Sequence, residues 1–137
     1  HSGDSWFWLL GLACVYWLGN TDWKSWSAIL VIAILVTAVV VMLIKFTVRR
    51  RRPEGEWGNI YRSTDPHSFP SGHAARAMLI AVLSLALAPA PWIGVLLAVW
   101  APLVALARVS MGVHYLSDVI AGGLLGIAMG GVILLIH

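Results

Sequence analysis

With 137 residues, of which 60% are hydrophobic and only 11% are charged, the chain is too apolar for a soluble domain, in which roughly half of the residues are apolar. The formal net charge of +3 does not indicate nucleic-acid binding, because the positive residues are concentrated at Arg49–Arg52 beside a hydrophobic run instead of covering a basic face. The single cysteine, Cys14, excludes an internal disulfide and a cysteine metal cluster.

Five apolar stretches are expected to be membrane-crossing helices. The first gives only about 21 Å of helix against a hydrocarbon core near 30 Å, whereas the second is long enough to cross. A polar turn, 19–24, separates these two, and a polar loop, 49–69, precedes the third. The expected helices are Ser5–Leu18, Ser25–Val48, Ser71–Leu87, Pro91–Val109 and Ser117–Ile136. The sequence thus predicts an all-α integral membrane bundle that forms one domain over 1–137, and it leaves open what precedes His1 and follows His137.

The order of the helices brings three charged stretches to one face of the membrane. The second helix ends at this face, the third begins there, and the fourth returns to it, so the stretches 45–53, 70–73 and 108–118 meet. Tryptophans are expected to form interfacial belts. Those on this face are Trp6, Trp8 and Trp57, and those on the opposite face are Trp17, Trp23, Trp26 and Trp92.

The start of the third helix is a candidate anion site. The first N–H groups of a helix lack intrahelical partners and carry a partial positive charge, so Ser71 and Gly72 can contribute donors to an oxyanion. Taken alone, the tetrapeptide Pro70-Ser71-Gly72-His73 is more typical of an ordinary helix cap than of an anion site, and its charged neighbours favour the anion site.

Lys45, Arg52 and Arg108 are the candidate cations for such an anion. A charge near the membrane requires an interface or an ionic partner, and a forked guanidinium suits the oxygens of a phosphate. Positive anchoring at the interface is the alternative reading for Lys45 and Arg52 taken singly.

Two histidines and one aspartate can supply acid, base and nucleophile. His114 and Asp118 are four residues apart, so the carboxylate can accept the Nδ1–H of the imidazole and leave Nε2 as a basic lone pair. His73 can then protonate a leaving oxygen. A metal held by the same three side chains is disfavoured, because the neighbouring cations would repel a divalent ion. We therefore predict no metal.

The spacing and order of these residues resemble the type 2 phosphatidic acid phosphatase family. One departure is Ala107, because the family usually has serine before the arginine; this removes a small hydroxyl near the phosphate. The matching residues are Lys45, with six residues between it and Arg52-Pro53, then Pro70-Ser71-Gly72-His73, then Arg108, with five residues between it and His114, which has three between it and Asp118.

The resemblance implies a membrane lipid phosphatase that needs no cofactor. In that reading His114 forms a phosphohistidine, Asp118 orients it, and His73 protonates the departing alkoxide. The substrate would be a phosphorylated lipid such as phosphatidate, phosphatidylglycerol phosphate or polyprenyl pyrophosphate. The alternatives are a lipid-linked phosphotransferase and a non-catalytic membrane protein that binds anions or lipids.

The same resemblance favours the inner membrane of a bacterium, with the site on the extracytoplasmic face. The positive-inside rule alone would place the arginine run in the cytoplasm, but the count includes cations that have a proposed role at the site. Oligomeric state is left open.

The remaining charged residues have plainer expected roles. The run Arg49–Arg51 is expected to anchor to anionic lipid, at about 1 kcal/mol for each residue. We expect Arg76 to be structural and His67 to be a solvated loop residue. Three acidic residues of the loop are expected either to pair with the arginines or to be solvated: Glu54, Glu56 and Asp65.

Small residues recur every four positions along the last helix. Gly122, Gly126 and Gly130 form a strip on one face of that helix. Such a strip permits the close approach of another helix, so we expect a packing surface there instead of a binding site.

Overall fold

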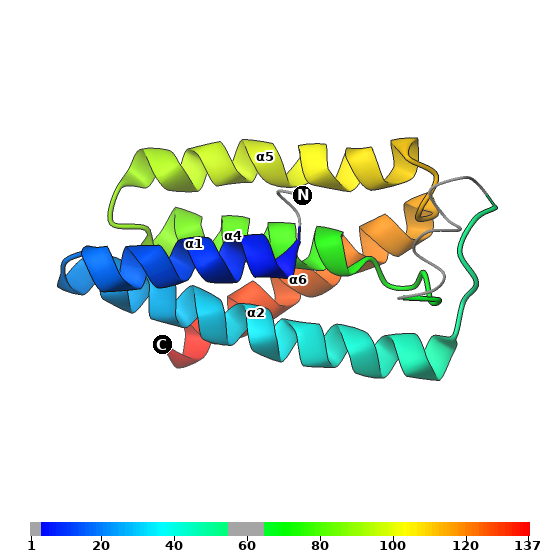
Figure 1. Ribbon diagram of the computed structural model, residues 1–137, viewed down its shortest axis with the longest axis horizontal. Coiled ribbons are helices and arrows are strands. Elements are labelled where there is room, and N and C mark those ends of the chain that lie inside the picture. The colour runs from blue at the N-terminus through cyan, green and yellow to red at the C-terminus, as the bar shows by residue number, and fades with distance from the viewer. Residues whose placement is uncertain (1–3, 55–64) are drawn as a thin grey trace.

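The computed structural model describes residues 4–54 and 65–137. Glu56 and Trp57 lie outside these ranges. The described part contains five helices that run along one long axis and no named strand, which confirms the all-α bundle (Figure 1). They are α1 (Ser5–Leu18), α2 (Thr21–Val48), α4 (Gly72–Leu87), α5 (Pro91–Ser110) and α6 (Leu116–Ile136).

Three of these helices, α2, α5 and α6, are long and apolar enough to cross a membrane, whereas α1 and α4 are shorter at 14 and 16 residues. The expected turn at 19–24 is wrong in its second half, because Thr21–Lys24 is already helical. The cause is a cap: the side chain of Asn20 accepts a hydrogen bond from the amide of Trp23 at 3.3 Å. α2 therefore gains a full turn at its start.

α4 lies at the centre of the bundle, packed against α2, α5 and α6. Its Leu79, Ile80 and Leu83 are fully buried and form a core with Leu30 and Ile34 of α2. Each such buried aliphatic side chain contributes on the order of 2 kcal/mol relative to exposure in water. A short helix suffices here, because the other helices surround it.

The glycine strip of α6 faces α4, as predicted. A Cβ at Gly122 would overlap the carbonyl oxygen of Ser71, and one at Gly126 would overlap that of Ala75. Backbone therefore packs directly on backbone along this seam, which only glycine allows. The seam fixes the start of α4 against α6.

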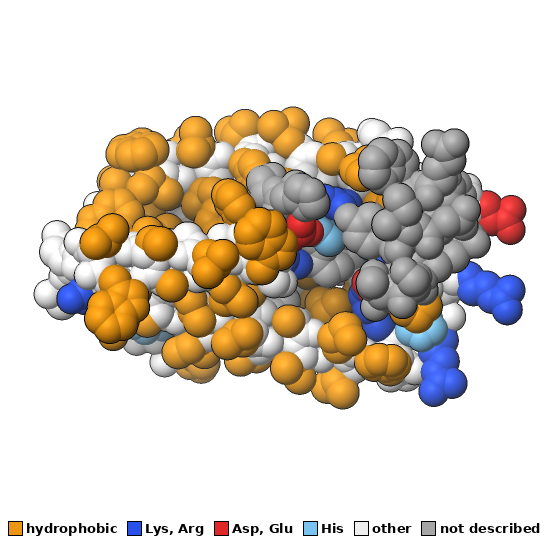
Figure 2. Space-filling view, in the orientation of Figure 1, with side chains coloured by type: hydrophobic (Ala, Val, Ile, Leu, Met, Phe, Trp, Pro, Cys, Tyr) orange, Lys and Arg blue, Asp and Glu red, His pale blue; other side chains and the backbone are white. Residues whose placement is uncertain are grey.

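Hydrophobic side chains cover most of the length of the molecule (Figure 2). Many are large and exposed, as expected of surface that faces lipid. The prediction that Trp26 belongs to an interfacial belt is wrong, because its side chain is buried in the core at 5% exposure. Trp6, Trp17 and Trp92 are exposed.

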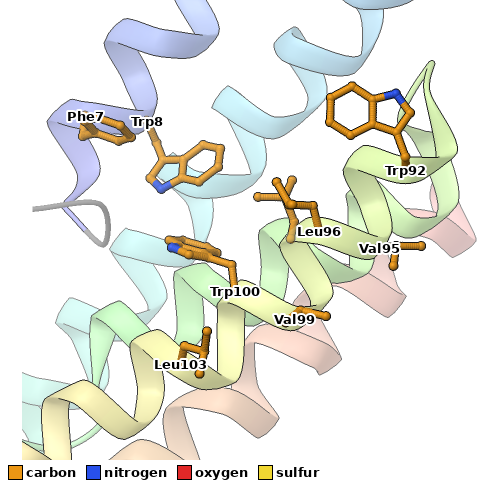
Figure 3. A pocket seen from close by; sticks show the side chains of 9 residues that line it. Phe7, Trp8, Trp92, Val95, Leu96, Val99, Trp100 and Leu103 are labelled. Atoms are coloured by element: carbon orange, nitrogen blue, oxygen red, sulfur yellow. The ribbon is translucent and has the colours of Figure 1, made fainter.

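An open apolar groove of about 800 Å³ lies between α1 and α5 (Figure 3). Trp8 of α1 and Trp100 of α5 meet across it, with their ring centroids 5.2 Å apart. Phe7 and Trp92 lie farther along its walls. The groove offers hydrocarbon-like surface to whatever lipid lies beside it.

The chain reverses direction after α2. Arg49 ends the helix in the left-handed conformation with φ of 51°, and the following residues then pair with the segment that leads into α4. Arg51 forms an antiparallel bridge with His67, and the amide of Ser68 donates to the carbonyl of Arg50 at 2.9 Å. This pairing places the first and second charged stretches side by side.

Candidate active site

The charged stretches meet at one end of the bundle, where the basic, acidic and histidine side chains gather (Figure 2). A cavity of about 170 Å³ opens among them. Four of the predicted site residues line this cavity, and so does Arg76, which we expected to be only structural. The four are Lys45, Gly72, His73 and His114.

His114 lies in the short link between α5 and α6, just after Gly112, whose φ of 65° turns the chain. Its Nε2 is 3.2 Å from Nη1 of Arg52, and because the guanidinium can only donate, Nε2 is the acceptor. This assigns the proton to Nδ1, the tautomer that the sequence argument required. The Nδ1 atom is 3.7 Å from Oδ2 of Asp118, longer than a hydrogen bond.

Burial lowers the pKa of His114 to about 3, and the charges of Arg52 and Lys45 act in the same direction. The imidazole side chain is only 2% exposed. His114 is therefore neutral at ordinary pH, which is the state that a nucleophile needs.

Asp118 is fully buried and makes several contacts at the start of α6. Its Oδ2 accepts the amide of Tyr115 at 2.9 Å, and its Oδ1 accepts Nη1 of Arg50 at 2.9 Å. Arg50 also donates to the hydroxyl of Ser117 at 2.7 Å and stacks over the ring of Tyr115 at 4.2 Å. The expectation of a lipid anchor is wrong for Arg50, because its head group is directed at this carboxylate.

His73 is in the first turn of α4, and its Nε2 donates to Oδ1 of Asp4 at 2.9 Å. Burial would raise the pKa of Asp4, but the hydrogen bond and the charges of His73 and Arg108 outweigh it and hold this pKa below its ordinary value. Arg108 is 8% exposed at the end of α5 and acts on this pair electrostatically. Asp4, His73 and Arg108 thus form one electrostatic group.

Ser71 is the N-cap of α4. Its hydroxyl oxygen accepts the amide of Ala74 at 3.4 Å, and its own amide donates to the carbonyl of Asp118 at 2.9 Å. The ordinary capping role thus holds, and the Ser71 amide is already engaged. A phosphate at this helix start would meet the Ser71 hydroxyl and the Gly72 backbone.

Lys45 and Arg52 share one carboxylate. Nζ of Lys45 and Nη2 of Arg52 both bind Oδ2 of Asp65, the latter at 2.7 Å. Nε of Arg52 also donates to the Asp65 carbonyl at 2.7 Å, and Nη1 donates to the carbonyl of Val113 at 2.9 Å. We expected the acidic residues of the loop to pair with Arg49–Arg51 or to be solvated. Asp65 instead pairs with Lys45 and Arg52.

Sequence reasoning missed the site roles of Asp4, Arg50 and Asp65. Asp4 and Asp65 lie outside the three charged stretches, and Arg50 lies within the first of them but is not one of the residues that carry the resemblance. The partner of each residue is distant in the sequence. Only the alternation of charge around 50–65 hinted at pairing. Among residues 4–54 and 65–137, no group of three or more His, Cys, Asp or Glu side chains is arranged to hold a metal ion.

Comparison with known proteins shows similarity in both sequence and fold. The sequence model described as the PAP2 superfamily matches residues 26–137. The decaprenylphosphoryl-5-phosphoribose phosphatase of Mycobacterium tuberculosis is 36% identical over 99 residues, which are 72% of this chain and 54% of that protein. The chain thus spans about half the length of the curated relatives it matches.

Two solved structures share the fold. LpxE of Aquifex aeolicus superposes with a TM-score of 0.75 at 28% identity, over 96% of this chain and 78% of that one. A transmembrane PAP2 type phosphatidylglycerolphosphate phosphatase from Bacillus subtilis gives a TM-score of 0.78 at 22% identity, over 99% of this chain and 71% of that one. The second likeness shows the fold alone.

Proposed function

We propose that this chain, which belongs to the PAP2 superfamily and is an integral membrane protein, is a phosphatase that removes the terminal phosphate of a lipid. The supporting observation is the cavity, where two histidines and a lysine from three different segments line a space of about 170 Å³. Phosphoryl transfer depends mostly on positioning and charge stabilisation, and this site is built to supply both.

In the first step Arg52 Nη1 releases the lone pair on Nε2 of His114, which attacks phosphorus; the N–P bond forms, and the bond to the lipid oxygen breaks. His73 gives a proton to the departing alkoxide. In the second step water attacks phosphorus, His73 takes its proton, and the N–P bond breaks. Asp118 compensates the positive charge on the phosphorylated imidazole.

Cations and helix donors hold the phosphate oxygens during both steps. Lys45, Arg52 and Arg108 supply charge, and Ser71 and Gly72 supply donors at the start of α4. Of these five, Lys45 and Gly72 line the cavity together with the two histidines. The scheme requires no metal and no cofactor.

The hydrocarbon tail of the substrate would lie between the helices or along their apolar surface, with its head group at the charged end. Polyprenyl phosphates, phosphatidate and phosphatidylglycerol phosphate share the terminal phosphate that the site would bind. The named activity of the mycobacterial relative, on a decaprenyl-linked substrate, supports this class.

Phosphate release in detergent tests the proposal. Wild type should release phosphate from at least one of the three lipids in the presence of EDTA, and His114→Ala should not. His67→Ala is the matched control, because the His67 ring packs edge-on against Phe46, its bridge to Arg51 is made by the backbone, and its side chain has no role in the proposed reaction. This variant should keep full activity. Equal rates in wild type and His114→Ala would remove the nucleophile, and release only with an added alcohol acceptor would indicate a phosphotransferase.

We further infer that the protein lies in a bacterial inner membrane with the charged end outside. The origin of two similar proteins in bacteria, Mycobacterium tuberculosis and Aquifex aeolicus, supports a bacterial membrane. Glu54→Cys in a Cys14→Ser background should react with a membrane-impermeant maleimide in intact cells, because Glu54 is exposed at the charged end. Labelling only after lysis would place this end in the cytoplasm.

A further inference from the structure

The Asp65 carboxylate occupies the cationic part of the site. It binds the Lys45 ammonium and the Arg52 guanidinium through the same oxygen, Oδ2, and Asp65 also lines the cavity with both histidines. The two cationic side chains are deeply buried, at 5% and 2% exposure, whereas the Asp65 side chain is 37% exposed. The carboxylate is therefore the member of this group that solvent reaches.

Asp65 takes the edge of Arg52 that a phosphate would use. A guanidinium binds an oxyanion best through two parallel N–H groups on one edge. On Arg52 the Nη2 atom of such an edge donates to the Asp65 carboxylate, and the Nε atom donates to the main-chain carbonyl of the same residue, at 2.7 Å each. The Nη1 atom donates to Val113 and faces His114 Nε2. A phosphate placed for attack by His114 that binds Nη2 of Arg52 and the Lys45 ammonium must displace the Asp65 carboxylate.

The charge of an anion determines how much it gains by displacing the Asp65 carboxylate from Lys45 and Arg52. A carboxylate carries one negative charge and so does a phosphodiester, whereas a terminal phosphate monoester carries nearly two near pH 7, since its second pKa is about 6. Exchange of Asp65 for a diester leaves the electrostatic balance of Lys45 and Arg52 unchanged. Exchange for a terminal phosphate improves it.

Resting on the proposed function, we propose that Asp65 is an internal counter-anion that competes with every anion for Lys45 and Arg52. It neutralises the two cations while the site is empty, so that a singly charged phosphodiester gains little by replacing it, whereas a terminal phosphate gains more. Phosphodiesters surround the site at the membrane interface, so without Asp65 they would occupy the two cations in the resting protein.

The test compares Asp65→Asn with wild type. Removing the internal competitor should lower the inhibition constant of inorganic phosphate roughly tenfold, by the arithmetic of a binding-competent state that becomes fully populated. The inhibition constant of phosphatidylglycerol, a phosphodiester, should fall by the same factor, because the free energy of displacing Asp65 is common to both anions. Both constants are measured from phosphate release in mixed micelles.

Glu54→Gln is the matched control. Glu54 is an exposed acid that lines a neighbouring cavity with Arg52, so its loss changes the local charge by the same amount without freeing the Arg52 edge. This variant should keep both wild-type inhibition constants. If Asp65→Asn binds both anions no more tightly than Glu54→Gln does, the counter-anion role is wrong and Asp65 is only a structural bridge.

A direct binding measurement separates this inference from the proposed function. Inorganic phosphate should raise the unfolding temperature of Asp65→Asn more than that of wild type, even if no lipid is hydrolysed. An equal or smaller rise in the variant overturns the inference and leaves the phosphatase proposal standing. If Asp65→Asn can be purified only in phosphate buffer, phosphate is replacing the carboxylate as proposed, and failure in every buffer shows a structural bridge.

Discussion

Arg50→Gln should weaken both the fold and the activity, because Arg50 holds a fully buried carboxylate. Asp118 is 0% exposed, and its Oδ1 receives the Arg50 guanidinium at 2.9 Å. Breaking a buried ion pair costs about 3–5 kcal/mol. Arg50 is itself 38% exposed, so water replaces part of the interaction in the variant. We expect a loss of about 1–2 kcal/mol in the free energy of unfolding, between the values for buried and exposed pairs.

The same loss should reach the chemistry, since Asp118 compensates the charge on His114 during the proposed reaction. If about 1.4 kcal/mol of that stabilisation is lost from the transition state, kcat falls about tenfold. Arg51→Gln is the control, because the Arg51 side chain is exposed and its loss leaves the contact between Arg50 and Asp118 in place. The assay is phosphate release together with denaturation in detergent. Identical stability and kcat in the two variants would refute the reasoning.

Two further results are expected. Gly126→Ala should lower the free energy of unfolding by about 1–3 kcal/mol, because the added methyl group overlaps the Ala75 carbonyl. Gly131→Ala should leave the stability unchanged, because the space around Gly131 is open. Equal stability of the two variants would contradict the close packing of α4 against α6. As pH falls below about 6.5, unfolded His114 gains a proton that folded His114, with its pKa lowered to about 3, does not, so stability should fall with pH in this window. His114→Asn should flatten that fall in thermal denaturation, and an unchanged slope would count against the burial.

The helices could be predicted well from the sequence, because a membrane-spanning helix requires a long and continuous apolar stretch. Four of the five expected stretches agree with the structure to within one residue at each end. The start of α2 was missed because the cap at Asn20 is a local hydrogen bond hidden in a polar stretch. The meeting of the three charged stretches followed from helix order alone.

The contacts inside the site could not be predicted in the same way. Asp65 and Asp4 carry no motif, and their partners lie 20 and 69 residues away along the chain. The distance of 3.7 Å between Nδ1 of His114 and Oδ2 of Asp118 depends on how Tyr115 and Arg50 hold the carboxylate, one at each oxygen. Spacing shows that two residues can meet, but the arrangement of several partners around one carboxylate requires coordinates.

The seam between α4 and α6 connects helix packing to the alignment of the two histidines. The backbone contact at Gly122, with the bond from Ser71 to Asp118, ties the two helix starts together, so the segments that carry His73 and His114 are held next to each other. The opposite wall of the cavity comes from α1 and α2. Substitutions on the cavity side of α1 and α2 therefore change the shape of the space, whereas substitutions along the seam change the relative position of the histidines.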